Sequence, residues 1–427
     1  MPRDTALDLL DAVLSTKIPL SRALEGPTGL KKLQPRERAF ARRLAATTLR
    51  RLGQIDRLID HCLERELPRK ARPVRQILRL GIAQLLFLDI PAHAAVDTTV
   101  RLCVKRGHGP HKALVNAVLR RLGREGEALI AEQDPGRLNT PEWLWNAWGD
   151  AYGEETRRKI AEAHLVEPPL DLTVKEAGAA AKWAELLGGE VLPTGSVRLK
   201  PKGPVSELDG FAEGAWWVQD AAAALPARLF GPLAGKNIID LCAAPGGKTA
   251  QLAAAEAAVT AVDRSVTRLR RLDRNMNRLG LKAEIIAADA HVWRPESLAD
   301  GVLLDAPCSA TGTIRRHPDV ARLKKPQDPA AMAEVQAALL AAAAEMVRPG
   351  GILVYCTCSM QPIEGEELIE AFLCSGAPFS RRPIRADEVG GLEEVLTAAG
   401  DLRSLPCHLA NRGGMDGFYA ARLIRKQ

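Results

Sequence analysis

The sequence lacks the uncharged apolar run of about 18 residues that a membrane-spanning helix requires. Its first segment, MPRDTALDLLDAVL, places acidic side chains among apolar ones, which predicts an amphipathic helix and not a secretory signal. Cysteines number eight in 427 residues without disulfide-framework spacing, and aromatic residues make up only 4%. We therefore expect a cytoplasmic protein with no membrane segment, free thiols and aliphatic cores.

Positive charge is concentrated in the first third of the chain. Residues 1–140 contain 26 Lys and Arg against 15 Asp and Glu, whereas the whole chain has 59 against 52. A basic N-terminal domain favours a polyanionic partner such as nucleic acid. A basic surface that meets only solvent would give the same composition, so charge alone leaves both interpretations open.

Hydrophobic periodicity divides the chain into three predicted parts. Residues 1–140 repeat apolar positions at helical spacing and predict an all-α domain. Residues 141–225 combine a tryptophan-bearing helix with strand-like pieces and prolines, which predicts a small α+β connector. In residues 226–427 apolar runs alternate with helical patterns, which predicts a parallel, doubly wound, Rossmann-like α/β domain. Ligands of such folds bind at the carboxyl ends of the strands.

The first strand–loop–helix segment of this domain, DLCAAPGGKTAQLA, has the features of a nucleoside-binding loop. Its two glycines allow a tight turn, and the start of the next helix presents unpaired N–H groups to an anionic group. The segment fits neither the dinucleotide fingerprint nor the P-loop. Asp263 and Asp289 close the next two predicted strands, where carboxylates can accept hydrogen bonds from a ribose and an adenine. One such aspartate could be a helix N-cap, but the series indicates a nucleoside pocket.

Two cysteines follow the fourth and fifth predicted strands. DAPCSATG places Asp305 and Cys308 at the edge of the pocket, and YCTCSMQ ends the neighbouring strand with Cys356 and Cys358. A thiolate that adds to carbon 6 of cytosine would let carbon 5 attack an electrophilic methyl group. Asp305 could contact ring nitrogen 3, and a second cysteine could assist release. Cys356 is better explained as a core residue, and we expect no metal because paired C-x₂₋₄-C ligands are absent.

Taken in order, these motifs resemble the RNA cytosine-5 methyltransferase family. The similarity runs from about residue 214 to the end and includes LLDAPCSATGTIRRHPD and LVYCTCSMQPIEGEE. It implies S-adenosylmethionine as the cofactor, Cys358 as the nucleophile and Cys308 as the cysteine needed for product release. It also implies a set of cofactor-contacting positions: Cys242, Ala243, Ala244, Pro245, Gly246, Gly247, Lys248, Asp263, Asp289 and Asp305.

The N-terminal part carries a second resemblance. IPAHAAVDTTVRLCVKRGHGPHKALVNAVLRRL is similar to the helical RNA-binding domain of the NusB antitermination factor. Together the two resemblances imply methylation of one cytosine of 16S ribosomal RNA, naked or partly assembled, by a monomer without an obligate protein partner. The alternatives are a non-catalytic RNA chaperone, a methyltransferase of transfer RNA or DNA, and a Rossmann oxidoreductase, which the first loop disfavours.

Overall fold

The computed structural model describes residues 2–26, 33–65, 67–200 and 203–427. The chain divides into two compact units, the first made of Met1–Val166 and Ile314–Lys325, the second of Glu167–Thr313 and Pro326–Gln427. Within the described residues, every helix is too short or too polar to cross a membrane.

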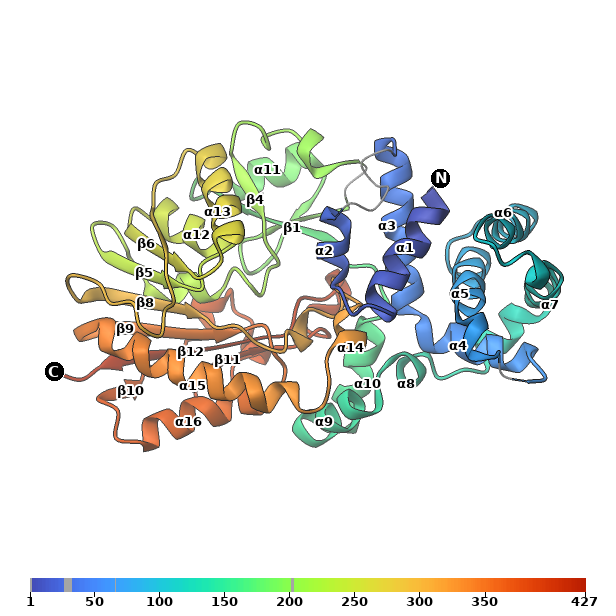
Figure 1. The fold of residues 1–427 in the computed structure, drawn as a ribbon. Coiled ribbons are helices and arrows are strands. Elements are labelled where there is room, and N and C mark those ends of the chain that lie inside the picture. Colours follow the sequence, from blue (N-terminus) through green and yellow to red (C-terminus); the bar gives the residue numbers. More distant parts are fainter. Residues whose placement is uncertain (1, 27–32, 66, 201–202) are drawn as a thin grey trace. The chain divides into compact units, whose positions relative to one another are not determined.

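The first unit is built from helices, as predicted for the N-terminal domain (Figure 1). They are α1 (Pro2–Leu14), α2 (Leu20–Glu25), α3 (Pro35–Arg50), α4 (Leu52–Cys62), α5 (Arg72–Phe87), α6 (Ala92–Lys105), α7 (Lys112–Ala131), α8 (Pro135–Asn139), α9 (Glu142–Tyr152), α10 (Glu154–Ala163) and α14 (Val320–Leu323). Helices α9 and α10 fall in the predicted connector but belong to this unit. The boundaries of the three predicted domains stay a prediction.

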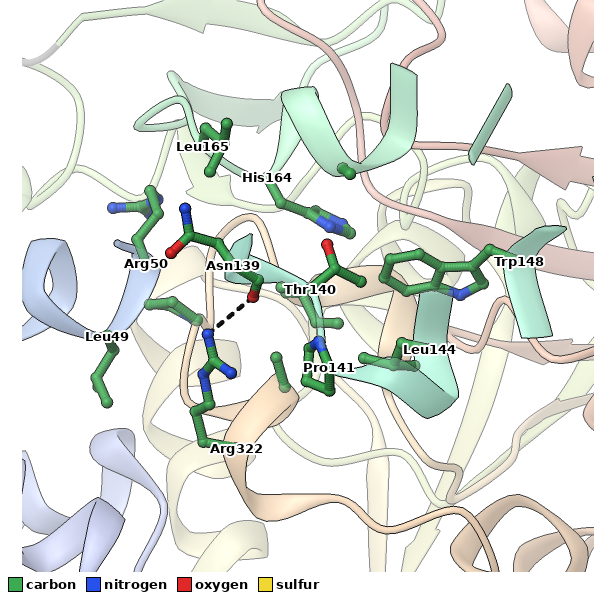
Figure 2. A pocket seen from close by; sticks show the side chains of 14 residues that line it. Leu49, Arg50, Asn139, Thr140, Pro141, Leu144, Trp148, His164, Leu165 and Arg322 are labelled. Atoms are coloured by element: carbon green, nitrogen blue, oxygen red, sulfur yellow. Dashed lines mark hydrogen bonds between the residues drawn. The ribbon is translucent and has the colours of Figure 1, made fainter. Parts of the chain in front are cut away.

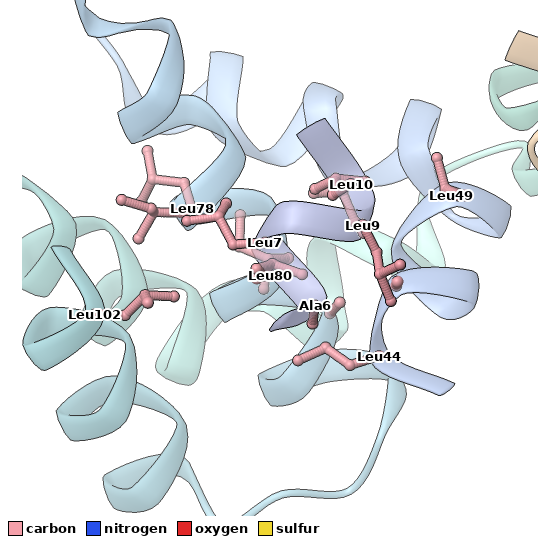
Figure 3. Close-up of a cluster of buried hydrophobic side chains, with 14 of the residues drawn as sticks. Ala6, Leu7, Leu9, Leu10, Leu44, Leu49, Leu78, Leu80 and Leu102 are labelled. Atoms are coloured by element: carbon pink, nitrogen blue, oxygen red, sulfur yellow. The ribbon is translucent and has the colours of Figure 1, made fainter. Parts of the chain in front are cut away.

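The core of the helical unit follows from the amphipathic pattern of its helices. Helix α1 contributes Leu7 and Leu10, which are almost fully buried. They share one cluster with Leu44 of α3 and Leu78 of α5 (Figure 3). A leucine that is completely buried contributes about 2 kcal/mol through burial alone, so this aliphatic cluster supplies the stability that scarce aromatics do not.

The second unit begins with a small antiparallel sheet. Its strand order is β2 (Glu190–Val191), β3 (Val197–Leu199), β1 (Leu170–Val174) and β4 (Trp216–Val218), and helix α11 (Ala180–Leu187) packs against it. Asp171 and Arg198 form an ion pair of 2.7 Å that is almost completely buried between β1 and β3. This α+β module agrees with the strand-like pieces read from the sequence.

The larger sheet of the second unit has the order β10-β12-β9-β8-β5-β6-β7, with β11 paired to β12. The strands are β5 (Asn237–Leu241), β6 (Ala258–Asp263), β7 (Glu284–Ala287), β8 (Ala299–Asp305), β9 (Val347–Thr357), β10 (Phe379–Arg381), β11 (Leu402–Ser404) and β12 (Phe418–Arg425). Helices α12 (Gly247–Ala254) and α13 (Val266–Leu279) lie on one face, and α15 (Asp328–Met346) and α16 (Glu366–Cys374) lie on the other (Figure 1).

The sheet is mixed, which corrects the prediction of a wholly parallel one. Strands β5 to β9 are parallel to one another, whereas β12 runs antiparallel to β9, and β10 and β11 run antiparallel to β12. The regular βα alternation stops after α16, so no helical crossover brings the last strand back in parallel. An antiparallel edge on a parallel sheet is common in such folds.

Candidate active site

The two predicted catalytic cysteines lie on neighbouring parallel strands. In the register of β8 and β9, Asp305 is opposite Cys356, so the loops that follow both strands leave the sheet at the same edge. Sγ of Cys308 lies 3.4 Å from Sγ of Cys358. Cys356 is fully buried, as expected of a core residue. The structure therefore brings Cys308 and Cys358 into contact, although their chemical roles stay predictions.

The thiol of Cys308 is held in its protonated form. Its hydrogen bond with Cys358 is the largest cause, and burial, the charge of Cys358 and the charge of Glu364 act in the same direction. Together they raise the pKa of Cys308 well above its usual range. At neutral pH Cys308 therefore keeps its proton in this contact.

Two glycines allow the Cys308 loop to approach Cys358 closely. The backbone N–H of Gly312 donates to the carbonyl of Cys358 at 2.9 Å, and the N–H of Gly417 donates to the carbonyl of Gly312 at 2.9 Å. A Cβ atom on Gly312 would overlap the carbonyl of Gly417. Only glycine therefore fits at position 312. Its two backbone hydrogen bonds attach the Cys308 loop to Cys358, just after β9, and to Gly417, just before β12.

The predicted cofactor loop joins β5 to α12. Gly246 has a φ of 101°, a left-handed conformation that favours glycine, and α12 begins at Gly247. The carboxylate of Asp263, at the end of β6, accepts from the N–H of Ala244 at 3.2 Å and from the N–H of Ser265 at 2.8 Å. Asp263 thus ties the cofactor loop to the second strand while it keeps further acceptor capacity.

Buried carboxylates surround the start of this loop. Burial, assisted by the charges of Asp305, Asp263 and Asp240, raises the pKa of Cys242 to about 12, so this thiol is unreactive at neutral pH. Asp240 is completely buried and accepts from the hydroxyl of Thr249 at 2.6 Å. Burial raises the pKa of Asp240 to about 7. Such a carboxylate-rich site favours a ligand with positive charge.

Lys248 and Asp305 form an ion pair between the cofactor loop and the Cys308 loop. Nζ of Lys248 lies 2.7 Å from Oδ2 of Asp305, and the lysine side chain is only 9% exposed. Burial is the largest single influence and opposes the lysine charge. The charge and hydrogen bond of Asp305, together with the charges of Cys356 and Asp240, outweigh burial and raise the pKa of Lys248. The ammonium also lies 4.8 Å from the ring centroid of Phe418. The ion pair therefore links the start of α12 to the end of β8, beside the strand that carries Cys356 and ends just before Cys358.

Asp289 lies apart from these carboxylates. It follows β7, its side chain is 52% exposed, and it accepts hydrogen bonds from the backbone and the ring of His291 at 3.0 and 2.8 Å. These features together suit a nucleoside that carries a sulfonium charge. They are a glycine turn, a helix start, the strand-end carboxylates of Asp263 and Asp305, and this outer aspartate.

Among the described residues, no three His, Cys, Asp or Glu side chains group in a way that could hold a metal ion.

The helical unit contains a small pocket that does not have the size of a nucleoside site. Arg50, Asn139, Trp148, His164 and Arg322 line it together with apolar residues (Figure 2). Its cavity volume is about 20 Å³, which is room for one water molecule. We therefore assign it to the interior of the helical unit and not to catalysis.

Part of the predicted basic surface is neutralised within the helical unit. The side chains of Lys105 and Arg106 pair with Asp4 at 2.5 and 2.9 Å, and Arg106 also pairs with Asp8 at 2.7 Å. The cluster around residue 108 thus presents less net positive charge than its sequence indicates.

Comparison with known proteins decides the family. Residues 227–424 match the family described as 16S rRNA methyltransferase RsmB/F, and residues 1–124 match the NusB family. Two proteins named ribosomal RNA small subunit methyltransferase B, from Cronobacter sakazakii and Pseudomonas syringae pv. tomato, are 37% and 39% identical to this chain. Each match covers 99% of this chain, and 98% and 97% of the relatives. The chain belongs to the RsmB/F family of rRNA methyltransferases.

A solved structure agrees with this RsmB/F assignment at the level of the fold. The crystal structure of the protein PH0851 superposes with a TM-score of 0.78 at 24% identity and covers 100% of this chain and 99% of its own. Membership of the RsmB/F family confirms the resemblances read from both halves of the sequence and S-adenosylmethionine as the cofactor. It favours ribosomal RNA methylation over the chaperone, DNA and oxidoreductase alternatives.

Sequence reasoning missed the polar residues behind the two cysteines of this RsmB/F protein. Ser309 and Ser359 directly follow Cys308 and Cys358, and both hydroxyls donate to the buried carboxylate of Glu364. The available signal was the repeated Cys-Ser pair together with an acidic residue five positions after the second serine.

Proposed function

We propose that this protein forms 5-methylcytosine at a specific cytosine of 16S ribosomal RNA through a covalent bond between Cys358 and carbon 6 of the base. The observation that carries the proposal is the 3.4 Å contact between the sulfurs of Cys308 and Cys358 at the carboxyl edge of the sheet. Two thiols in contact can act on adjacent atoms of one ring, and carbons 5 and 6 are adjacent.

The first step is attack by Cys358. Cys358 gives its proton to solvent, and its sulfur lies 3.4 Å from the protonated sulfur of Cys308. The sulfur then bonds to carbon 6, and the electrons of the carbon 5–carbon 6 double bond become available at carbon 5. Asp305, held by Lys248, is the proposed partner of ring nitrogen 3.

The bound cofactor supplies an electrophilic methyl group, and residues 242–248 with Asp263, Asp289 and Asp305 are the proposed contacts that hold it. After methyl transfer, the proton on carbon 5 must leave. Once Cys358 is bonded to carbon 6, the hydrogen bond and the thiolate charge that raise the pKa of Cys308 are gone. Cys308 then loses its own proton more easily and can take the proton from carbon 5, directly or through water. The ring double bond re-forms and Cys358 leaves as a thiolate.

The target cytosine must be unstacked for a thiol to reach carbon 6. We propose naked or partly assembled 16S RNA as the substrate, a monomer as the active form, and the cytoplasm as the place of action. The basic helical unit is the proposed contact for the surrounding phosphates, so RNA affinity should fall steeply with salt concentration.

Methyl transfer from radiolabelled S-adenosylmethionine to naked 16S RNA tests the proposal. Wild type should yield labelled 5-methylcytosine after digestion, and Cys358→Ala should yield none. Cys374→Ala is the matched control, because Cys374 is an exposed thiol on α16. Transfer by Cys358→Ala at the wild-type rate would overturn the covalent mechanism, and label on a different atom or base would overturn the product.

A further inference from the structure

The side chain of Glu364 is fully buried. It contacts the loop after β8, which carries Cys308, and the loop after β9, which carries Cys358; these are the two cysteine loops. We propose that Glu364 is a positioning residue that joins these loops and fixes the distance between the thiols of Cys308 and Cys358. The catalytic meaning of this distance rests on the proposed function, but the distance itself can be tested without RNA or cofactor.

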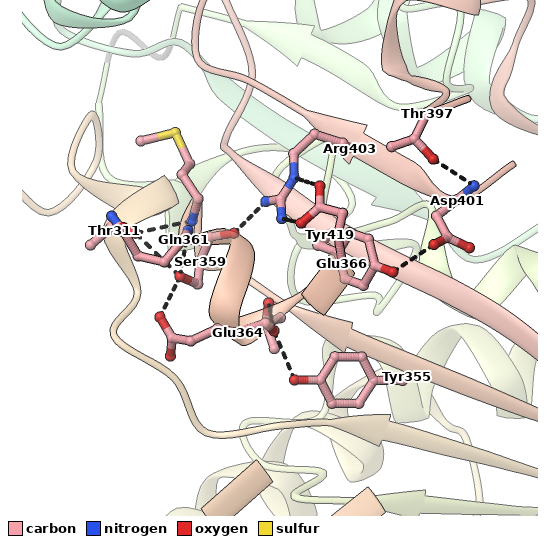
Figure 4. Close-up of polar contacts among 12 residues, drawn as sticks. Thr311, Tyr355, Ser359, Gln361, Glu364, Glu366, Thr397, Asp401, Arg403 and Tyr419 are labelled. Carbon is pink, nitrogen blue, oxygen red and sulfur yellow. Dashed lines mark hydrogen bonds and ion pairs between the residues drawn. The ribbon is translucent and has the colours of Figure 1, made fainter. Parts of the chain in front are cut away.

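The contacts of Glu364 reach both loops at once. Its carboxylate accepts from the backbone N–H of Ser309 at 2.8 Å and from the hydroxyl of Ser309. It also accepts from the hydroxyl of Ser359 at 2.5 Å (Figure 4). The two serine hydroxyls lie 3.0 Å apart. Because Ser309 and Ser359 each follow a cysteine directly, this one carboxylate holds the two residues next to the thiols.

A second ring of contacts holds Glu364 itself. Nε2 of Gln336 donates to its carboxylate at 3.0 Å and to the carbonyl of Pro307 at 2.8 Å, just before Cys308. The hydroxyl of Tyr355, which is fully buried, donates to the backbone carbonyl of Glu364 at 2.9 Å (Figure 4). Gln336 on α15 thus holds the carboxylate, and Tyr355 on β9 holds the backbone of the same residue.

Burial makes these bonds obligatory. An ionised carboxylate in a protein interior is strongly destabilising unless donors satisfy its oxygens. A carboxylate has about four acceptor positions, and here four donor groups occupy them. Hydrogen bonds to an ionised acceptor are also roughly twice as strong as neutral ones. The same four bonds that satisfy this buried carboxylate therefore hold the two loops together.

Misplacement of reacting groups by about 1 Å can reduce an enzymatic rate by about 100-fold. Adduct formation needs the sulfur of Cys358 at carbon 6, and release needs Cys308 at the neighbouring carbon. Separation of the two loops would therefore reduce the rate of methyl transfer, whereas the cofactor loop, which Asp263 holds, would keep its structure.

The rate of disulfide formation reports how close the two thiols lie. Diamide takes two electrons and two protons from Cys308 and Cys358, is reduced to the hydrazine, and leaves an S–S bond of about 2.05 Å. Sulfurs that already lie 3.4 Å apart need little movement to form that bond. Mass spectrometry of the peptide pair follows the rate in the full-length protein, with bonds to other cysteines separated by mass.

Glu364→Ala should slow this disulfide by at least about tenfold, since the loops lose their shared anchor. Glu364→Gln, which keeps the size and an acceptor oxygen, should restore most of the rate. Glu388→Ala is the matched control. Its carboxylate pairs with Arg422, and its partners lie outside both cysteine loops.

If Glu364→Ala does not fold, Ser309→Ala and Ser359→Ala test the same anchor one bond at a time, and each should slow the disulfide. An unchanged rate in the folded serine variants, or an equal loss in Glu388→Ala, would overturn the proposal. Failure of wild type to methylate 16S RNA would overturn the proposed function but leave the disulfide result standing. If both hold, Glu364→Ala should show reduced kcat with unchanged KM for the cofactor, and Glu364→Gln should recover most of that kcat.

Discussion

Acidification should destabilise the helical unit through His164. This side chain is only 7% exposed, its ring centroid lies 5.3 Å from that of Trp148, and among the described residues its Nε2 has no hydrogen-bond partner. Burial, with smaller contributions from the charges of Arg315 and Arg50, lowers the pKa of His164 to about 3. The folded unit therefore keeps this imidazole neutral through the whole range in which free histidine titrates.

The sign and size of the effect follow from proton linkage. Below about pH 6.5 the unfolded chain binds a proton at this histidine, whereas the folded chain binds it only near pH 3. The free energy of unfolding thus falls as the pH falls between these values. A pH of about 5 lies about 1.5 units below the ordinary pKa of histidine. Because one unit corresponds to about 1.36 kcal/mol, proton binding by the unfolded chain lowers the free energy of unfolding at this pH by about 2 kcal/mol.

His164→Phe keeps a ring beside Trp148 and removes the titration. Urea unfolding at about pH 7 and pH 5, followed by hydrogen exchange on peptides of each unit, measures the effect. When the pH falls from about 7 to about 5, the free energy of unfolding measured on peptides from α9 and α10 should fall by about 2 kcal/mol more in wild type than in the variant. Peptides from the larger sheet are the internal control and should show no difference. Equal losses in wild type and variant would refute the reasoning.

Two further predictions concern the active site. Cys308→Ala should accumulate a covalent protein–RNA adduct, because attack by Cys358 proceeds while release fails; denaturing gels without a shifted band would contradict the division of roles. Asp263→Ala should weaken S-adenosylmethionine binding by at least about tenfold, because the cofactor loop loses its bond to the end of β6. Calorimetry should show this loss with RNA affinity unchanged, and an unchanged cofactor affinity would remove Asp263 from the site.

The sequence predicts the parallel part of the fold well because of how such strands are buried. Strands covered on both faces appear as continuous apolar runs, and NIIDL, AVTAVD and GVLLDAP mark β5, β6 and β8. The same pattern carries no information on strand direction. The antiparallel β12 therefore looked like one more strand of a parallel sheet, and its pairing with β9 emerged only from the structure.

Side-chain contacts between residues that are far apart in the chain could not be predicted from the sequence, either in the basic cluster or next to the two cysteines. The basic cluster at Lys105 and Arg106 appears free in the sequence, but its acidic partner Asp4 lies about a hundred residues earlier. Ser309 and Glu364 are separated by 55 residues and look like ordinary polar positions. Only the register of β8 against β9 brings them together, and a register is fixed by the whole sheet.

The carboxylate of Glu364 acts on the cysteines through its charge as well as through its bonds. It is one of the causes that raise the pKa of Cys308, so it favours the protonated thiol at that position. In the proposed mechanism, a Cys308 thiol that stays protonated leaves Cys358 as the attacking residue. Geometry and charge can be separated, because Glu364→Gln removes the charge and keeps most of the anchor. In that variant the disulfide should form at nearly the wild-type rate, whereas the preference for Cys358 as the attacking thiol should weaken.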